Sequence, residues 1–285
     1  MKLVFIHGRD QQKKDPVKLQ NQWVRALKKG LKAADLKFPS KIDIHFPFYG
    51  DKLDELIKKL DTPLIDGVKF RGDGTNSDEA SFRGALLSEM AEKAGITDSE
   101  IQKHYQGSSR EKGVLNWGWV QAILKALDGT PLGEAAIDSF ARDVFVYLTN
   151  PTVRKTIEGI VKPFLSSGPC VVVGHSLGSV VGYNLLSQTK AVVKKYVTVG
   201  SPLAIKAIKQ KLVLPLSMPI STQAWFNALD RRDGVALYPL DSEHFKIKPP
   251  IKNKTDVNNT TANRHGIKGY LDDPVVAREI YKVLV

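Results

Sequence analysis

The sequence predicts an α/β protein with a mostly parallel sheet of about five or six strands flanked by helices. Short apolar runs at residues 3–6, 170–173 and 195–199 are typical of strands, and stretches with helical spacing lie between them. The β-branched run of valines at residues 171–173 is typical of a central strand that is buried on both faces. Alternation of strands and helices at this spacing predicts a parallel sheet.

The first sixty residues contain two strands and two helices. Apolar side chains at Leu19, Trp23, Leu27 and Leu31 recur at helical spacing with lysines between them, and Gly30 favours a helix end nearby. Residues 42–46 alternate between apolar and polar and predict a second strand, which ends in a loop at residues 47–50. Residues 51–60 predict the next helix.

Residues 63–155 interrupt this alternation. Gly, Asp, Asn and Ser crowd residues 71–81, and helical stretches follow at residues 82–94, 115–127 and 135–148, without a strong strand signal. The interval carries a small acidic excess, whereas both flanking regions are basic. We therefore expect one domain over residues 1–285, with residues 63–155 as a helical insertion.

The alternation resumes after Pro151. We expect a helix to residue 165, strands at 170–173, 195–199 and 224–229, a helix at 179–187 and a closing helix at 274–284. Residues 252–264 are polar and are predicted as a loop. Between Val235 and His265, residues 245–247 are the only segment with a strand-like pattern.

Composition excludes several classes of protein. Hydrophobic residues make up 42% and charged residues 25%, as in ordinary globular proteins. The single cysteine, Cys170, excludes an intramolecular disulfide and a cysteine-rich zinc site, and we expect it to be a small core residue. No apolar run approaches the roughly 20 residues of a membrane-spanning helix, and no signal peptide is visible. We therefore expect a cytoplasmic protein.

The formal net charge is +12. A positive field of this kind attracts nucleic acid, an anionic membrane surface or an anionic substrate. The lysines are scattered rather than gathered in a block, and no nucleic-acid-binding motif is visible. A solvated basic surface is the simpler interpretation, nucleic acid is not favoured as a partner, and an anionic surface or substrate stays open.

Residues 174–178, Gly-His-Ser-Leu-Gly, form a G-x-S-x-G motif between a buried strand and a helix. A sharp turn at this point strains the serine backbone, and glycines on either side remove side chains that would collide there. The turn directs Ser176 Oγ outward, and the helix start supplies N–H groups that can stabilise an oxyanion. The motif and its context resemble the α/β-hydrolase family, specifically its lipase- and esterase-like members.

This resemblance implies further site residues. The segment His-Gly-Arg at residues 7–9 is similar to the oxyanion loop of the family, which makes the backbone N–H groups of Arg9 and Leu177 the expected oxyanion donors. The segment after the strand at 224–229 makes Asp233 the expected acid, with Asp230 as the alternative. His265, before the last helix, is the expected base. The chain order Ser, Asp, His is that of the family.

Other interpretations of these residues stay open. Ser176 could instead belong to a phosphate-binding or structural turn. His244 is the main alternative to His265, but it follows Asp233 closely. We expect His175 to face away from the reaction and His7 to hydrogen-bond the oxyanion loop.

The expected function is therefore cleavage of carboxylic esters through an acyl-enzyme on Ser176, with a small-molecule or lipid ester as substrate. His265 acts as base and then acid, Asp233 orients it, and no metal or organic cofactor is required. Two alternatives are a phospholipase or acyl-thioesterase with an anionic substrate, and a non-catalytic α/β-hydrolase-fold protein that binds a ligand.

The insertion is a candidate lid, because insertions in this family cover the carboxyl ends of the strands. Its apolar residues either line an acyl pocket or pack the insertion onto the sheet, and the sequence does not distinguish these roles. They are Val114, Leu115, Trp117, Trp119, Phe140, Val144, Phe145 and Tyr147.

Overall fold

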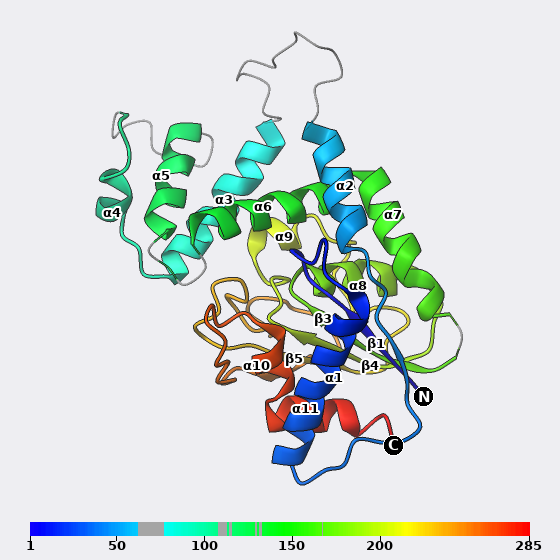
Figure 1. The fold of residues 1–285 in the computed structure, drawn as a ribbon. Coiled ribbons are helices and arrows are strands. Elements are labelled where there is room, and N and C mark those ends of the chain that lie inside the picture. Colours follow the sequence, from blue (N-terminus) through cyan, green and yellow to red (C-terminus); the bar gives the residue numbers. More distant parts are fainter. Residues whose placement is uncertain (62–76, 108–112, 114–115, 129, 131–132, 167) are drawn as a thin grey trace.

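A six-stranded, entirely parallel sheet forms the centre of the molecule in a computed structural model that describes residues 1–61, 77–107, 113, 116–128, 130, 133–166 and 168–285 (Figure 1). The strand order is β2-β1-β3-β4-β5-β6. This arrangement confirms the predicted α/β class and the predicted number of strands. The bounds are β1 Lys2–Ile6, β2 Asp43–His45, β3 Cys170–His175, β4 Val193–Val199, β5 Trp225–Ala228 and β6 Lys252–Lys254.

Both faces of the central strands are buried. In β1, Leu3 and Phe5 belong to one hydrophobic cluster, while Val4 and Ile6 belong to another on the opposite face. This division follows from the two-residue period of a strand. Because helices cover both faces, the central strands contain continuous apolar runs instead of an alternating pattern.

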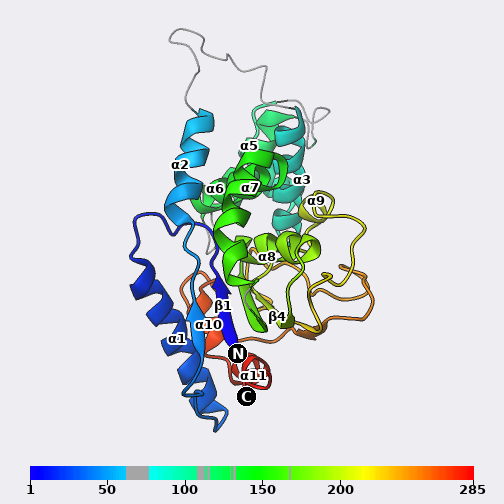
Figure 2. The same ribbon diagram turned by 90° about the vertical axis from the view of Figure 1, so that its right-hand side faces the viewer.

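Different helices cover the two faces. Helices α1 (Pro16–Ala33) and α11 (Pro274–Tyr281) pack together on one face, next to α10 (Ile267–Leu271). On the other face α8 (Leu177–Gln188) lies against β1 and β3, and α7 (Pro151–Val161) packs on α8. Figure 2 shows α1 and α8 on opposite sides of the sheet.

The described part of the predicted insertion is helical. It contains α3 (Ser77–Lys93), α4 (Asp98–Gln102), α5 (Trp117–Leu127) and α6 (Glu134–Thr149), and it follows α2 (Gly50–Asp61). The remaining short helices are η2 (Lys162–Phe164) and α9 (Lys206–Lys209). Apolar residues of α3, α5 and α6 join the same hydrophobic cluster as Val4, Ile6 and Val172, so these helices share a core with the sheet.

The strand order reverses between β1 and β3. From β1 the chain passes to β2 on one side, and the later strands β4 to β6 follow on the other side of β3. In open parallel sheets, ligands bind outside the carboxyl ends of the strands at such a reversal. Residues 7–9 and 176 follow β1 and β3 directly, so the fold places the predicted site at this point.

The prediction for the last strand is wrong. Residues 245–247 lie in a turn region, and the final strand is β6, which lies in the polar segment predicted as a loop. Its register pairs Phe226 with Lys252 and Ala228 with Lys254. β6 is an edge strand with exposed and half-buried side chains, so backbone pairing holds it and no apolar pattern marks it.

Within the described residues, no helix combines the length and the apolar character that crossing a membrane requires.

Candidate functional site

Ser176 occupies a strained turn between β3 and α8. Its backbone has φ 54° and ψ −129°, a left-handed conformation that is uncommon for residues other than glycine. The Ser176 N–H donates to the carbonyl of Val199 at 3.3 Å, which ties the turn to the end of β4. A Cβ at Gly178 would overlap the carbonyl of Ile6, so only glycine lets α8 approach β1 this closely.

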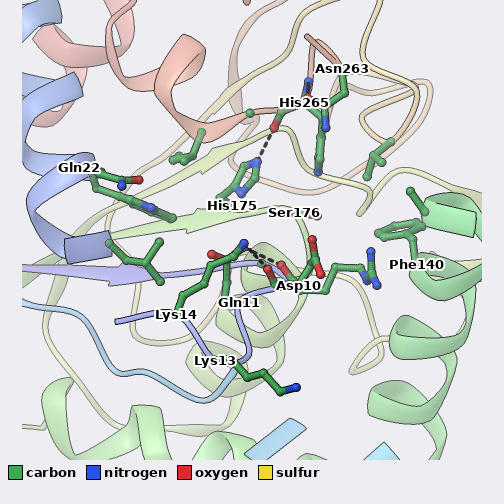
Figure 3. A pocket seen from close by; sticks show the side chains of 18 of the residues that line it. Asp10, Gln11, Lys13, Lys14, Gln22, Phe140, His175, Ser176, Asn263 and His265 are labelled. Carbon is green, nitrogen blue, oxygen red and sulfur yellow. Dashed lines mark hydrogen bonds between the residues drawn. The ribbon is translucent and has the colours of Figure 1, made fainter. Parts of the chain in front are cut away.

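Ser176 is 2% exposed and lines a pocket of about 700 Å³ (Figure 3). Gly8 faces it across the turn, where an added Cβ would lie 2.9 Å from Ser176 Cβ. Because the rest of the residue is enclosed, a reactant reaches this hydroxyl from the pocket.

His265 and Asp233 form a close pair at the same end of the sheet. The His265 Nδ1 atom lies 2.7 Å from Asp233 Oδ2 and 3.0 Å from Asp233 Oδ1. Asp233 also accepts hydrogen bonds from the hydroxyl of Tyr270 at 2.5 Å and from the backbone N–H groups of Val235 and Ala236 at 2.8 Å and 3.2 Å. The carboxylate is thus enclosed and held by four donors.

These donors decide the charge of Asp233. Burial by itself raises the pKa of a carboxyl group, but His265, the Tyr270 hydroxyl and the Val235 N–H outweigh it and hold the pKa of Asp233 below its ordinary value. Asp233 is therefore ionised at neutral pH, as a carboxylate that orients a histidine must be.

Two of the three predicted triad residues, Ser176 and His265, line one pocket, and the third, Asp233, is hydrogen-bonded to His265. His265 and Ser176 both line it, but among the hydrogen bonds of the described residues none joins Ser176 Oγ to His265. Because Nδ1 of His265 faces Asp233, Nε2 is the ring nitrogen left for the serine. Catalytic hydrogen bonds often become short only when the substrate is bound.

The expectation that His175 faces away from the site is wrong. His175 lines the pocket, its Nε2 donates to the backbone carbonyl of His265 at 2.8 Å, and the two rings lie 4.8 Å apart (Figure 3). Burial lowers the pKa of His175 to about 3, so the ring is neutral. The sequence did not reveal this contact because it joins β3 to a loop ninety residues later.

His7 supports the loop that follows β1, as expected. Its Nδ1 donates to the carbonyl of Gly8 at 2.6 Å, and its Nε2 accepts the N–H of Tyr49 at 3.1 Å. Burial lowers the pKa of His7 to about 4, and its ring stacks on Tyr49 at 3.9 Å. His7 is therefore a neutral structural residue beneath the predicted oxyanion loop.

Of the predicted oxyanion donors, Leu177 directly follows Ser176, and Arg9 lines the same pocket. Leu177 is the first residue of α8, and the N–H groups of a first helical turn have no acceptor within the helix. Arg9 lines the pocket, and its side chain forms an ion pair with Asp143 of α6 at 2.6 Å. This pair ties the loop after β1 to the insertion. The role of both N–H groups stays a prediction.

Neither alternative candidate has the contacts of the residue it would replace. Asp230 accepts hydrogen bonds from Arg232 and from the N–H of Asn259, and among the hydrogen bonds of the described residues none joins it to His265. His244 pairs with Asp241 and stacks on Tyr238, away from the pocket lining. Within the described residues, no group of three or more His, Cys, Asp and Glu side chains is arranged to hold a metal ion.

The insertion contributes one wall of the pocket through Met90, Ile137 and Phe140. Of its predicted apolar residues, Phe140 lines the pocket, whereas Trp119, Val144, Phe145 and Tyr147 are buried in the core. Val114, Leu115 and the side chain of Trp117 lie outside the described part of the chain. Most of the described residues therefore pack the insertion onto the sheet.

Sequence reasoning missed Tyr270 and the lysines of the pocket. Tyr270 is fully buried, and its hydroxyl contacts both Asp233 and the N–H of Asp230. Lys13, Lys14 and Lys18 line the pocket. The only signal for the lysines was their position directly after the predicted oxyanion loop.

Comparison of the chain with models of known families, with curated proteins and with solved structures finds no match.

Proposed function

We propose that this protein is a serine hydrolase of the α/β-hydrolase type that cleaves carboxylic esters through an acyl-enzyme on Ser176. The observation that carries the proposal is the convergence of Ser176 and the Asp233–His265 pair on one pocket at the carboxyl ends of the strands. These residues come from the turn after β3 and from the loops after β5 and β6. Their order along the chain is the order of the resembled family.

The fold supports the same proposal. A parallel sheet whose order reverses beside the serine-bearing strand is compatible with an α/β-hydrolase core. The left-handed backbone of Ser176 and the close approach at Gly178 are the features that a nucleophile turn requires. A structural turn needs neither an enclosed Asp–His pair nor a pocket in front of its hydroxyl.

In the proposed reaction, His265 Nε2 takes the proton of Ser176 Oγ while Oγ attacks the ester carbonyl carbon. The N–H groups of Arg9 and Leu177 stabilise the resulting oxyanion. The imidazolium then gives its proton to the departing alcohol, which leaves an acyl group on Ser176. Water, activated by His265, releases the acid and restores the serine. Ionised Asp233 holds the imidazole and stabilises its charged form.

We also propose that the insertion acts as a lid that selects the acyl group. Met90 of α3 and Ile137 and Phe140 of α6 supply an apolar wall next to Ser176. The Arg9–Asp143 ion pair couples this wall to the oxyanion loop. Closure of such a wall over an acyl chain excludes water from the reaction.

A fluorophosphonate probe tests the proposal. It should label the wild type, and Ser176→Ala should abolish labelling. Ser187→Ala, which removes a half-buried hydroxyl at the other end of α8, should retain it. Labelling that survives in Ser176→Ala would contradict the assignment of the nucleophile. A folded wild type that neither reacts with the probe nor cleaves para-nitrophenyl esters would indicate a ligand-binding protein instead.

A further inference from the structure

The pocket in front of Ser176 has two chemically different walls. One is the apolar wall of the insertion that contains Phe140, and the other is built by residues 9–15 and the first turns of α1. Figure 3 shows Lys14 and Gln22 on the opposite side of Ser176 from Phe140. The acyl and alkoxy groups of an ester also extend in opposite directions from the carbonyl carbon, so each wall can contact one of them.

The loop that carries the charged wall is rigidly supported. Asp10 and Lys13 both have φ of 60°, a left-handed conformation that the surrounding structure must maintain. The Lys13 N–H donates to Asp51 Oδ1 at 2.6 Å, and the Gln11 side chain donates to the carbonyl of Arg9 at 2.8 Å. A Cβ at Gly50 would lie 2.8 Å from the Gln11 backbone, so the start of α2 fits closely beneath the loop.

Two of the charges on this wall are already engaged. Arg9 is paired with Asp143, which balances its charge. The Asp15 carboxylate caps α1 by accepting the N–H groups of Val17 and Lys18. The Arg9–Asp143 pair therefore adds little net charge to the pocket, whereas the capping N–H groups orient the Asp15 carboxylate and leave it charged.

The remaining charges are mainly positive. Lys14 donates to the backbone carbonyl of Asp10, a neutral acceptor that orients the ammonium group without balancing its charge. Within the described residues, the ammonium groups of Lys13 and Lys18 form no ion pair. The Asp10 carboxylate opposes them and accepts one long hydrogen bond, of 3.4 Å, from Gln12. Three ammonium groups without an ion pair thus share this wall with two carboxylates, those of Asp10 and Asp15, which leaves a net positive charge.

We propose that the alcohol part of the ester substrate carries a negatively charged group, such as a phosphate, sulfate or carboxylate, which Lys13, Lys14 and Lys18 bind. This inference rests on the proposed function. The acyl chain then lies against Ile137 and Phe140. Leu19 and Trp23 lie on the same wall as the lysines, so an apolar linker can connect the ester to the anionic group.

Two esters of one acid test the inference. They are para-butanoyloxybenzenesulfonate and the neutral para-butanoyloxy-N,N-dimethylbenzenesulfonamide, whose phenols are both activated by a sulfonyl group. Exposed charge pairs are individually weak, so we expect kcat/KM to be about three- to tenfold higher for the sulfonate. The preference should fall as salt is raised.

Paired variants locate the binding groups. Lys14→Gln/Lys18→Gln should remove the preference for the sulfonate. Lys32→Gln, at the other end of α1, removes an exposed lysine outside the pocket and should retain the preference. Equal kcat/KM for the two esters, or a preference that survives in the double variant, would overturn the inference.

A binding measurement tests the anion site independently of the proposed hydrolase activity. If the wild type cleaves neither ester, the hydrolase proposal fails, and equilibrium titration of Ser176→Ala with both esters becomes the test of the anion site. The anion site would be supported if the sulfonate ester binds more tightly than the neutral ester and if this difference disappears when Lys14→Gln and Lys18→Gln are added. Equal binding of both esters would overturn it.

Discussion

Two Asp–His pairs in this molecule use the same atoms but differ in their surroundings. In both, Nδ1 of the imidazole faces the carboxylate, at 2.7 Å in Asp233–His265 and at 2.9 Å in Asp241–His244. The Asp233 side chain is 0% exposed, whereas that of Asp241 is 39% exposed. The first pair joins two loops thirty-two residues apart, and the second closes one turn of chain.

The difference lies in what the imidazole can reach. His265 lines the pocket of Ser176, while His244 stacks on Tyr238 at 4.7 Å outside it. Contact between a carboxylate and an imidazole is therefore not enough to mark a functional site. Such a pair becomes a candidate site when the imidazole also lines a pocket that contains a nucleophile. If the first pair is catalytic and the second structural, the same substitution should affect activity differently in the two pairs.

The largest difference is expected on removing the imidazoles. His265→Ala should lower kcat for a para-nitrophenyl ester by about 10⁶-fold, as loss of the general base does in serine hydrolases. His244→Ala should leave kcat within about threefold, because a partly exposed ion pair contributes little. Steady-state kinetics measures both, and a comparable loss in the two variants would remove the distinction between the pairs.

Replacing each carboxylate by the amide of the same shape also compares the two pairs, with a smaller change in structure than removal of the imidazole. Asp233→Asn should reduce kcat by about 10⁴-fold, because the amide favours the wrong tautomer of His265. Asp241→Asn should retain nearly full activity. An Asp233→Asn variant as active as Asp241→Asn would show that His265 does not need its carboxylate.

The two carboxylates should also contribute differently to the free energy of unfolding, and both contributions should depend on pH. The pKa of Asp233 is held low by His265, Tyr270 and Val235 against the effect of burial, and that of Asp241 is held low mainly by His244, again against burial. A carboxyl group with a lowered folded-state pKa contributes stability above its unfolded pKa, and this contribution is lost as the pH falls through the folded value.

At pH 7 we expect Asp233→Asn to cost about 2–4 kcal/mol in free energy of unfolding. Asp241→Asn should cost about 1 kcal/mol or less. Both differences from the wild type should narrow as the pH falls below about 4, because these carboxyl groups take up protons in the unfolded chain at a higher pH than in the folded protein. Urea denaturation at pH 7 and pH 3 measures the free energy of unfolding of each variant and of the wild type. A difference between variant and wild type that is larger at pH 3 than at pH 7 would contradict the assigned charges.

Tyr270 is expected to have a moderate effect. Tyr270→Phe removes the hydroxyl that donates to Asp233 Oδ2 and should lower kcat about tenfold, the typical cost of a lost hydrogen bond to a charged group. Tyr238→Phe is the matched control beside His244 and should leave kcat unchanged. If the two variants behave alike, Tyr270 supports the fold alone.

The smallest effect concerns the apolar wall. Phe140→Ala should change relative kcat/KM between butanoyl and decanoyl esters by about three- to tenfold, because it removes apolar contact area from the pocket. Phe145→Ala, in the core of the same helix, should alter stability rather than the acyl-length profile. An unchanged profile in Phe140→Ala would contradict the proposed lid.

The sequence predicts the buried strands of the sheet better than the exposed strand at its edge. The runs at β1, β3 and β4 are apolar because helices cover both faces, and the helix α1 shows its buried side through Leu19, Trp23 and Leu27. β6 carries Lys, Asn and Lys and is held by pairing with β5, so its side chains contain no periodic signal. Edge position explains this missed strand.

The site was predictable where one short segment specifies it. The turn at Ser176 follows from two glycines between a buried strand and a helix, and His7 follows from its place after β1. The contacts of His175 with His265 and of Tyr270 with Asp233 join segments that are remote along the chain. No local pattern encodes such contacts.

Local sequence thus determined the order of strands and helices, the strained serine turn and the residue types available for chemistry, because backbone preferences and apolar periodicity act over a few residues. The contact between Asp233 and His265, the neutral ring of His175 and the place of the lysines in the pocket lining were decided by tertiary structure. Packing brings distant loops to one edge of the sheet, and burial there sets which groups are charged.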